Sequence, residues 1–196
     1  MRQLTFYSIL TFSFLCFLGF GFAQAQVKFT AKNTIHLAVS GTSTLHDWVM
    51  KTSEGTCLAT LVVDADGNLK DFTSMSFSVP SKALKSGKDG MDKNAYKALK
   101  ADKNPSINAT LKSAEVTAKD DKSYYIKAMV SLTLAGKTID TQIEAEAKRS
   151  NDNSFAIKGD KKISMKEYGM EPPSFMLGAV KTGNEVVLHF DLVLNQ

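Results

Sequence analysis

The sequence predicts an all-β domain, an eight-stranded antiparallel barrel with one short capping helix. Three observations predict it. Apolar and polar side chains alternate along most of the chain after residue 26, as they do in half-buried strands. Short turns rich in Asp, Asn and Gly separate these runs at the spacing of β-hairpins. One segment, residues 89–101, has helical periodicity instead.

The first 25 residues are predicted to be a signal peptide, outside the folded domain. Arg2 supplies a positive start, residues 9–22 form an apolar run, and Ala23-Gln24-Ala25 fits the small-x-small pattern of a signal peptidase site. The run is shorter than the roughly 20 residues of a membrane-spanning helix, which argues against an anchor. We therefore expect export to the periplasm or the cell exterior, and one mature domain of residues 26–196.

The alternation is clearest near the C-terminus. Leu188, Phe190 and Leu192 share one face of a strand, whereas His189 and Asp191 share the other. Strands predicted in this way lie near residues 27–40, 44–51, 55–64, 69–80, 106–117, 123–135, 138–149, 154–163 and 185–195. The first two or three can form one long interrupted ribbon. That leaves about eight strands, the number that closes a barrel around one small ligand.

Two segments interrupt the strands. In residues 89–101, Met91, Ala95 and Leu99 lie near one helical face, and Pro105 prevents the helix from continuing. We expect this helix to cap one mouth of the barrel. Residues 165–181 are unusually apolar for a loop, so they either fold over a bound ligand or pack as a satellite core cluster.

Charge and cysteine content exclude two classes of protein. The net charge of +4 is small, and the lysines are scattered among acids, so we expect no nucleic-acid partner. Removal of the signal peptide leaves Cys57 as the only cysteine, which excludes an internal disulfide. The strand around Cys57 predicts that the thiol packs in the core, and stability must come from that core.

His46 and Asp47 are the residues that most suggest catalysis. Neighbouring residues of a strand point to opposite faces, so this pair is not expected to form a catalytic dyad. His36 and His189 are isolated, and no close spacing suggests a zinc site. We expect no catalytic residue, no metal and no cofactor, and a structural hydrogen-bonding role for His46 and Asp47 near the barrel mouth.

Four stretches follow one another along the chain: GTSTLHDW at residues 41–48, the segment from Met91 to Ile107 with its Asn104-Pro105, LTLAGKT at residues 132–138, and YGM with the following PP and FMLG at residues 168–178. In this order they resemble the YceI-like family of exported, lipocalin-like polyisoprenoid-binding proteins. The resemblance implies an extended eight-stranded barrel that holds a long isoprenoid chain, such as a quinone tail. Many members carry an arginine where this chain has Met165, so recognition of the ligand's head group does not carry over.

We therefore expect an exported, non-enzymatic protein that sequesters or carries a polyisoprenoid or similar long apolar lipid inside the barrel. Methionines suit a pocket that adapts to a flexible chain. The candidate ligand-binding residues are Trp48, Met75, Phe77, Met91, Tyr96, Leu99, Ile107, Val130, Met165, Met170, Phe175 and Phe190. We also expect transient contact with a membrane, and a monomer or a dimer.

Two alternatives remain open at this point. Periodicity distinguishes the inside of a barrel from its outside, but it does not distinguish a filled interior from a hollow one. A solid core would make the protein a secreted structural or adhesion domain without a ligand. A hydrolase or isomerase acting on a lipid would instead use His46 and Asp47.

Overall fold

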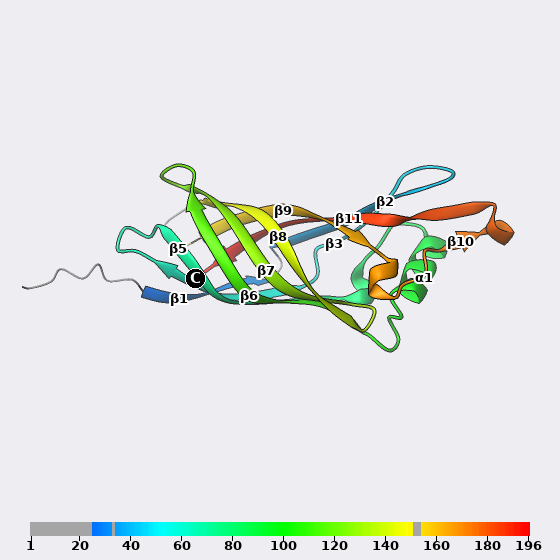
Figure 1. Ribbon diagram of the computed structural model, residues 1–196, viewed down its shortest axis with the longest axis horizontal. Coiled ribbons are helices and arrows are strands. Elements are labelled where there is room, and N and C mark those ends of the chain that lie inside the picture. Colours follow the sequence, from blue (N-terminus) through cyan, green and yellow to red (C-terminus); the bar gives the residue numbers. More distant parts are fainter. Residues whose placement is uncertain (1–24, 33, 151–153) are drawn as a thin grey trace, which may run out of the picture.

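The computed structural model describes residues 25–32, 34–150 and 154–196. Its strands form the closed eight-stranded antiparallel barrel that the sequence predicts (Figure 1). The strands are β1 (Ala25–Lys32), β2 (Ile35–Ser43), β3 (Trp48–Thr52), β4 (Thr56–Val63), β5 (Leu69–Pro80), β6 (Ser106–Ala118), β7 (Ser123–Leu134), β8 (Lys137–Arg149), β9 (Ser154–Ser164), β10 (Ser174–Phe175) and β11 (Val180–Asn195). The helical elements are α1 (Asp89–Ala98) and the short 3-10 turns η1 (Ser81–Ala83), η2 (Lys166–Tyr168) and η3 (Met176–Gly178). Of the predicted signal peptide, only Ala25 lies within the described residues, at the start of β1.

Two of the eight barrel strands are each made of two elements separated by an interruption, and we call each of these two strands an arm. β1 and β2 both pair with β11, so together they form one arm. β3 and β4 form the next arm, because β3 pairs with β2 and β4 pairs with β1. The expected total of eight strands is confirmed, but the grouping differs: the second and third predicted strands join into one ribbon (β3 and β4), whereas the first is itself interrupted and pairs with them. The strand expected near residues 44–51 starts later, at Trp48, because residues 44–47 form the turn of the β2–β3 hairpin.

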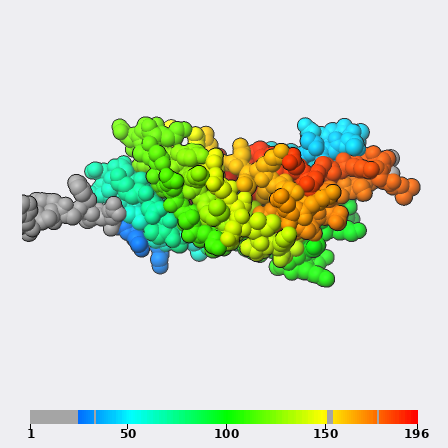
Figure 2. All heavy atoms as spheres, viewed as in Figure 1, coloured from blue at the N-terminus to red at the C-terminus, as the bar shows by residue number. Residues whose placement is uncertain are grey.

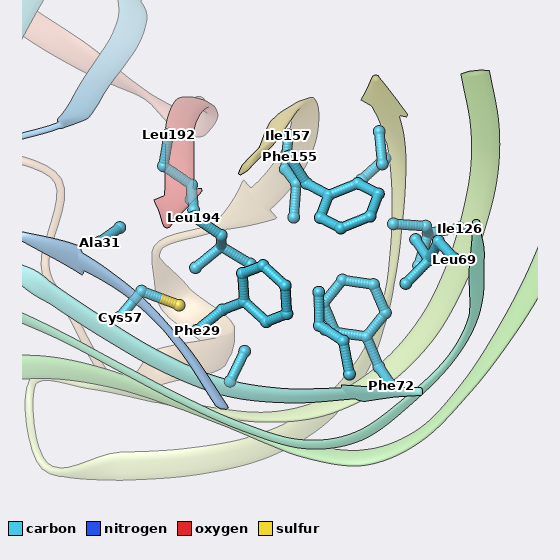
Figure 3. Packing of buried hydrophobic residues seen from close by; sticks show 14 of the residues in the cluster. Phe29, Ala31, Cys57, Leu69, Phe72, Ile126, Phe155, Ile157, Leu192 and Leu194 are labelled. Carbon is cyan, nitrogen blue, oxygen red and sulfur yellow. The ribbon is translucent and has the colours of Figure 1, made fainter. Parts of the chain in front are cut away.

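Aromatic side chains close the end of the barrel where β1 begins. This aromatic plug consists of Phe29, Phe72, Tyr124 and Phe155, which are all buried. The Phe29 and Phe155 rings meet edge to face with centroids 5.6 Å apart, and Tyr124 meets Phe155 in the same way at 6.3 Å. Figure 3 shows Phe29, Phe72 and Phe155 turned toward one another between the strands. Edge-to-face pairs add to the energy of burial, so this end is firmly packed.

The opposite end is covered by the segment between β5 and β6. At this end β3 pairs with β2 along one edge. Along its other edge, two backbone hydrogen bonds join Lys51 of β3 to Lys85 of the covering segment. The buried Asp92 carboxylate accepts hydrogen bonds from the Ser86 hydroxyl at 2.6 Å and its amide at 2.8 Å, which fixes the start of α1. The predicted capping helix is confirmed, and it ends at Ala98 within the expected range of residues 89–101.

The apolar segment of residues 165–181 divides into two parts. Met165, Tyr168 and Met170 are each at most 6% exposed, and the Met165 amide donates to the Asn184 carbonyl. This first part is therefore core, as one of the two interpretations predicted. Residues 171–175 and 177–181 are more exposed, and the short β10–β11 hairpin lies here, at the tip of the molecule (Figure 1).

Candidate ligand-binding cavity

Two cavities lie inside the barrel, one behind the other. The inner cavity, next to the aromatic plug, has a volume of about 150 Å³. The mouth cavity, beneath α1, has a volume of about 350 Å³. Val39, Ile107, Leu134 and Leu188 line both cavities, which are therefore adjacent, and we call the two together the tunnel. The interior of the barrel is therefore hollow toward the helix-covered end and solid toward the other.

The inner cavity is lined almost entirely by apolar side chains from the barrel strands. The predicted residues that line it are Met75, Phe77, Ile107, Val130 and Phe190. Room is left because four inward positions carry only a methyl group: Ala109, Ala114, Ala128 and Ala145. Gly159 has no side chain at all, and a Cβ there would lie 2.6 Å from the Phe190 ring. The ring of Phe190 thus occupies the space above Gly159.

The mouth cavity is built from four separate parts of the chain: the β2–β3 hairpin, α1, the η2 segment and β10. The predicted residues that line it are Trp48, Met91, Leu99, Ile107, Met165, Met170 and Phe175. Trp48 packs over Gly41 of the neighbouring strand, where a Cβ would overlap the indole ring, and its Nε1 donates to the Thr42 carbonyl at 3.1 Å. The indole is therefore held at the mouth and does not plug the barrel.

Tyr96 differs from the other predicted residues because it lines neither cavity. Its hydroxyl lies 2.9 Å from the carbonyl oxygens of both Lys82 and Leu84. The Lys85 ammonium lies 5.1 Å from the centre of its ring. Tyr96 therefore ties α1 to the chain after η1, because a partly buried hydroxyl requires a hydrogen-bond partner and these carbonyls supply it.

Lys161 lines the inner cavity and was not among the predicted residues. A signal for it was present in the sequence. Phe155, Ile157 and Ile163 alternate along β9 and face inward, and the same period places Lys161 inward. Leu37, Val39 and Leu188 were also missed, although they follow the same alternation on β2 and β11.

His46 lines the mouth cavity, but its Nδ1 is held by the neighbouring backbone, and Cys57 is buried in a neutral form. The His46 Nδ1 lies 2.7 Å from the backbone carbonyl of Asp47, and the Ser43 hydroxyl oxygen accepts from the His46 amide at 3.2 Å. Both bonds stabilise the β2–β3 turn. Burial raises the pKa of the Cys57 thiol to about 12, so it stays protonated. Among residues 25–32, 34–150 and 154–196, no three His, Cys, Asp or Glu side chains are placed to hold a metal ion.

No family model matches the sequence, and no curated protein sequence matches it significantly. Solved structures do match the barrel. BcnA of Burkholderia cenocepacia has a TM-score of 0.65 at 10% identity, over 83% of this chain and 98% of its own. A polyisoprenoid-binding domain from Saccharophagus degradans also has 0.65, at 9% identity, over 87% of this chain and 99% of its own. The YceI protein of Campylobacter jejuni has 0.52 at 17% identity, over 71% of this chain and 81% of its own.

The fold is that of the YceI proteins. The predicted fold class is thereby confirmed by comparison as well as by the strand order. The similarity extends over most of this chain, 87% of it for the Saccharophagus domain. Within the described parts of the chain, no helix is both long enough and apolar enough to span a bilayer.

Proposed function

We propose that this protein is an exported carrier that holds a polyisoprenoid or similar long apolar lipid in the tunnel of its barrel. The observation that carries the proposal is the tunnel itself: two cavities with shared walls, lined by apolar side chains and covered by α1 at one end. A structural or adhesion domain would have no use for such a space, because an empty cavity lowers the stability of the fold.

The energetics favour a long, flexible hydrocarbon. Burial of one methylene contributes about 0.8 kcal/mol, so an isoprene unit with its five carbons contributes on the order of 3–4 kcal/mol. A few buried units already offset the entropic cost of association. Met75, Met91, Met165 and Met170 are distributed along the tunnel, and their unbranched side chains adapt to a chain of changing shape.

Similarity to other proteins supports the same ligand class. The four stretches that resemble the YceI-like family fall on the parts of the chain that surround the mouth cavity: the β2–β3 hairpin, α1, the β7–β8 turn and the η2–β10 segment. The Saccharophagus degradans domain of the same fold is described as polyisoprenoid-binding. Membership of the YceI-like family would also agree with the predicted signal peptide and export.

The mechanism is passive binding. The residues that line the tunnel would contact the tail, and α1 with residues 171–181 would move aside to admit it. The neutral Cys57 thiol supports a binding role over a catalytic one, and so does the Nδ1 of His46, which faces the backbone carbonyl of Asp47 although His46 lines the mouth cavity. In this proposal Trp48 is a wall of the entrance and Phe190 a wall of the inner cavity.

Two exposed leucines at the mouth suggest how the ligand is exchanged. Leu45, at the β2–β3 tip, is 70% exposed, and Leu177, at the β10–β11 tip, is fully exposed with a left-handed φ of 53°. Thr44 and Lys181 hydrogen-bond to each other across the two tips, so both leucines belong to one surface. Figure 2 shows the two tips projecting from the same end of the molecule. A lipid bilayer would cover both leucines during transient contact.

The direct test is extraction of the mature protein, residues 26–196, purified after expression with its own signal sequence. Organic extraction and mass spectrometry should find a co-purifying isoprenoid. A thermal-shift screen against quinones and polyprenyl phosphates should then raise the melting temperature in proportion to the logarithm of ligand concentration, as mass action requires. Repeated purification without any lipid, together with no shift for either ligand class, would refute the carrier proposal.

A further inference from the structure

The segment that covers the mouth of the barrel is strongly basic. Residues 82–103, which we call the basic cap, hold seven lysines and three aspartates. The resulting net charge of +4 equals that of the whole chain, so the rest of the chain is neutral overall. All seven lysines are exposed: Lys82, Lys85, Lys88, Lys93, Lys97, Lys100 and Lys103. Lysines are scattered along the chain, but their excess over acids is concentrated at this one end.

Most ammonium groups of the basic cap are not neutralised within the protein. Lys82 pairs with Asp102 at 2.6 Å, and the Lys85 ammonium lies 3.9 Å from the carboxylate of the buried Asp92. Among the residues that the structure describes, the other five lysines of the basic cap form no salt bridge. Asp89 is the only remaining acid of the segment. The basic cap therefore presents a surplus of positive charge to the solvent.

The helix α1 places these charges beside the entrance of the tunnel. One of its faces lines the mouth cavity, through Met91, Ala95 and Leu99. The opposite face, together with the turn that follows it, carries three exposed lysines: Lys93, Lys97 and Lys100. Lys88, the residue before α1, is exposed and also belongs to the wall of the mouth cavity, so it lies at the rim.

The other charges at this end cancel, and the exposed leucines lie near by. Residues 165–181 hold two lysines and two glutamates, and residues 44–51 hold one aspartate and one lysine. Leu45 lines the same cavity as Lys88, so both lie around one opening. Figure 1 shows α1 at the same end of the molecule as β10 and the β2–β3 turn. Basic residues beside exposed apolar side chains are typical of surfaces that bind anionic membranes.

We propose that the basic cap docks the protein on a membrane rich in anionic phospholipids. This inference rests on the proposed carrier function and names the partner of its mouth. Lipid phosphates lie against the exposed lysines, Leu45 and Leu177 enter the apolar layer, and the mouth cavity opens toward the bilayer. The lysines need not touch the lipid, because charges act over about 10 Å at an ionic strength of about 0.1 M. Each lysine close to such a surface strengthens binding about fivefold.

The test measures co-sedimentation of the mature protein with two kinds of vesicle, anionic phosphatidylethanolamine–phosphatidylglycerol and neutral phosphatidylethanolamine–phosphatidylcholine. The wild type should bind the anionic vesicles at least about tenfold more tightly, and added salt should remove most of this preference. Two double variants have the same net charge: Lys93→Gln, Lys97→Gln in the basic cap, and the control Lys28→Gln, Lys32→Gln at exposed positions of β1. Affinity for the anionic vesicles should fall at least about tenfold in the first and stay within about twofold in the control.

Both double variants should keep the increase in melting temperature that added isoprenoid produces, since none of the four lysines lines a cavity. Equal wild-type binding to the two kinds of vesicle, including no binding to either, would overturn this inference and favour an acidic protein as the partner of the basic cap. Equal weakening in the two double variants would overturn it as well. Neither result would affect the carrier proposal, which is tested by extraction of a co-purifying lipid.

Discussion

Ala128→Leu tests whether the barrel interior is empty, because the sign of its effect on stability depends on the answer. Ala128 faces the inner cavity from the middle of β7. Leucine adds three carbons, which contribute about 2.4 kcal/mol if each is buried without strain, at about 0.8 kcal/mol per carbon. Loss of leucine rotamers removes about 0.5–1 kcal/mol of this. The ligand-free protein should therefore become more stable by about 1–2 kcal/mol.

The assay is thermal unfolding of lipid-stripped protein, in which about 1 kcal/mol raises Tm by about 2–4 °C for a domain of this size. The same side chain occupies the ligand's space, so the Tm increase produced by added isoprenoid should shrink. Ala31→Leu is the matched control, because Ala31 is 1% exposed in the packed part of the barrel and lines neither cavity. It should lose about 1–3 kcal/mol through overpacking. An equal loss in Ala128→Leu would refute the hollow interior.

Three further predictions concern other parts of the molecule. The Cys57 thiol, with its pKa near 12, should resist alkylation by iodoacetamide at pH 8 in the native protein and react rapidly in urea, as mass spectrometry can follow. Hydrogen bonds from Asn68, with a smaller contribution from Lys70, lower the pKa of the Asp64 carboxyl to about 2. Asp64→Asn should therefore reduce the free energy of unfolding by about 1–2 kcal/mol at pH 6. The double variant Leu45→Asp, Leu177→Asp should co-sediment with phosphatidylethanolamine–phosphatidylglycerol vesicles at least fivefold less than the wild type. The control Leu58→Asp changes a leucine that is 59% exposed on the barrel wall, and it should co-sediment as the wild type does.

Each of these has an outcome that contradicts it. Rapid alkylation of native Cys57 would mean that the thiol is accessible or ionised. The stabilisation by Asp64 is present above its unfolded pKa near 3.8 and is lost as the pH falls through about 2, so the deficit of Asp64→Asn should vanish toward pH 2. A deficit that stays constant with pH would place its cause elsewhere. Equal vesicle binding by the leucine variants and the wild type would exclude the two tips as the membrane contact.

Most of the fold could be predicted from the sequence because its signals are local. Alternation with a period of two identifies inward positions one strand at a time, and Val130 and Phe190 illustrate how well this works for the cavity wall. The helix was equally predictable, since Pro105 and the apolar face around Met91 are local features. The exact start of β3 was not, because the turn of residues 44–47 depends on hydrogen bonds of Ser43 that only the folded hairpin reveals.

The cavity itself could not be predicted, because emptiness depends on side chains that meet across the barrel. Phe29 and Phe155 fill one end, although they follow the same alternation as residues that face open space farther along. Tyr96 was assigned to the ligand site on composition, but its hydroxyl finds carbonyls that are distant from it in sequence. Lys161 was overlooked because a charged residue interrupts the apolar pattern of this face, although its position follows the same alternation as Ile157 and Ile163.

The rings packed at the end where β1 begins make the tunnel a blind tube. In the proposed carrier, the lipid would therefore leave through the opening by which it entered. The donor and the acceptor of the lipid would therefore compete for a single docking face. The protein would bind one of them, dissociate, and then bind the other. A carrier of this kind would transfer lipid by diffusing between membranes and not by spanning the gap between them, so its rate would rise with its diffusion coefficient and concentration.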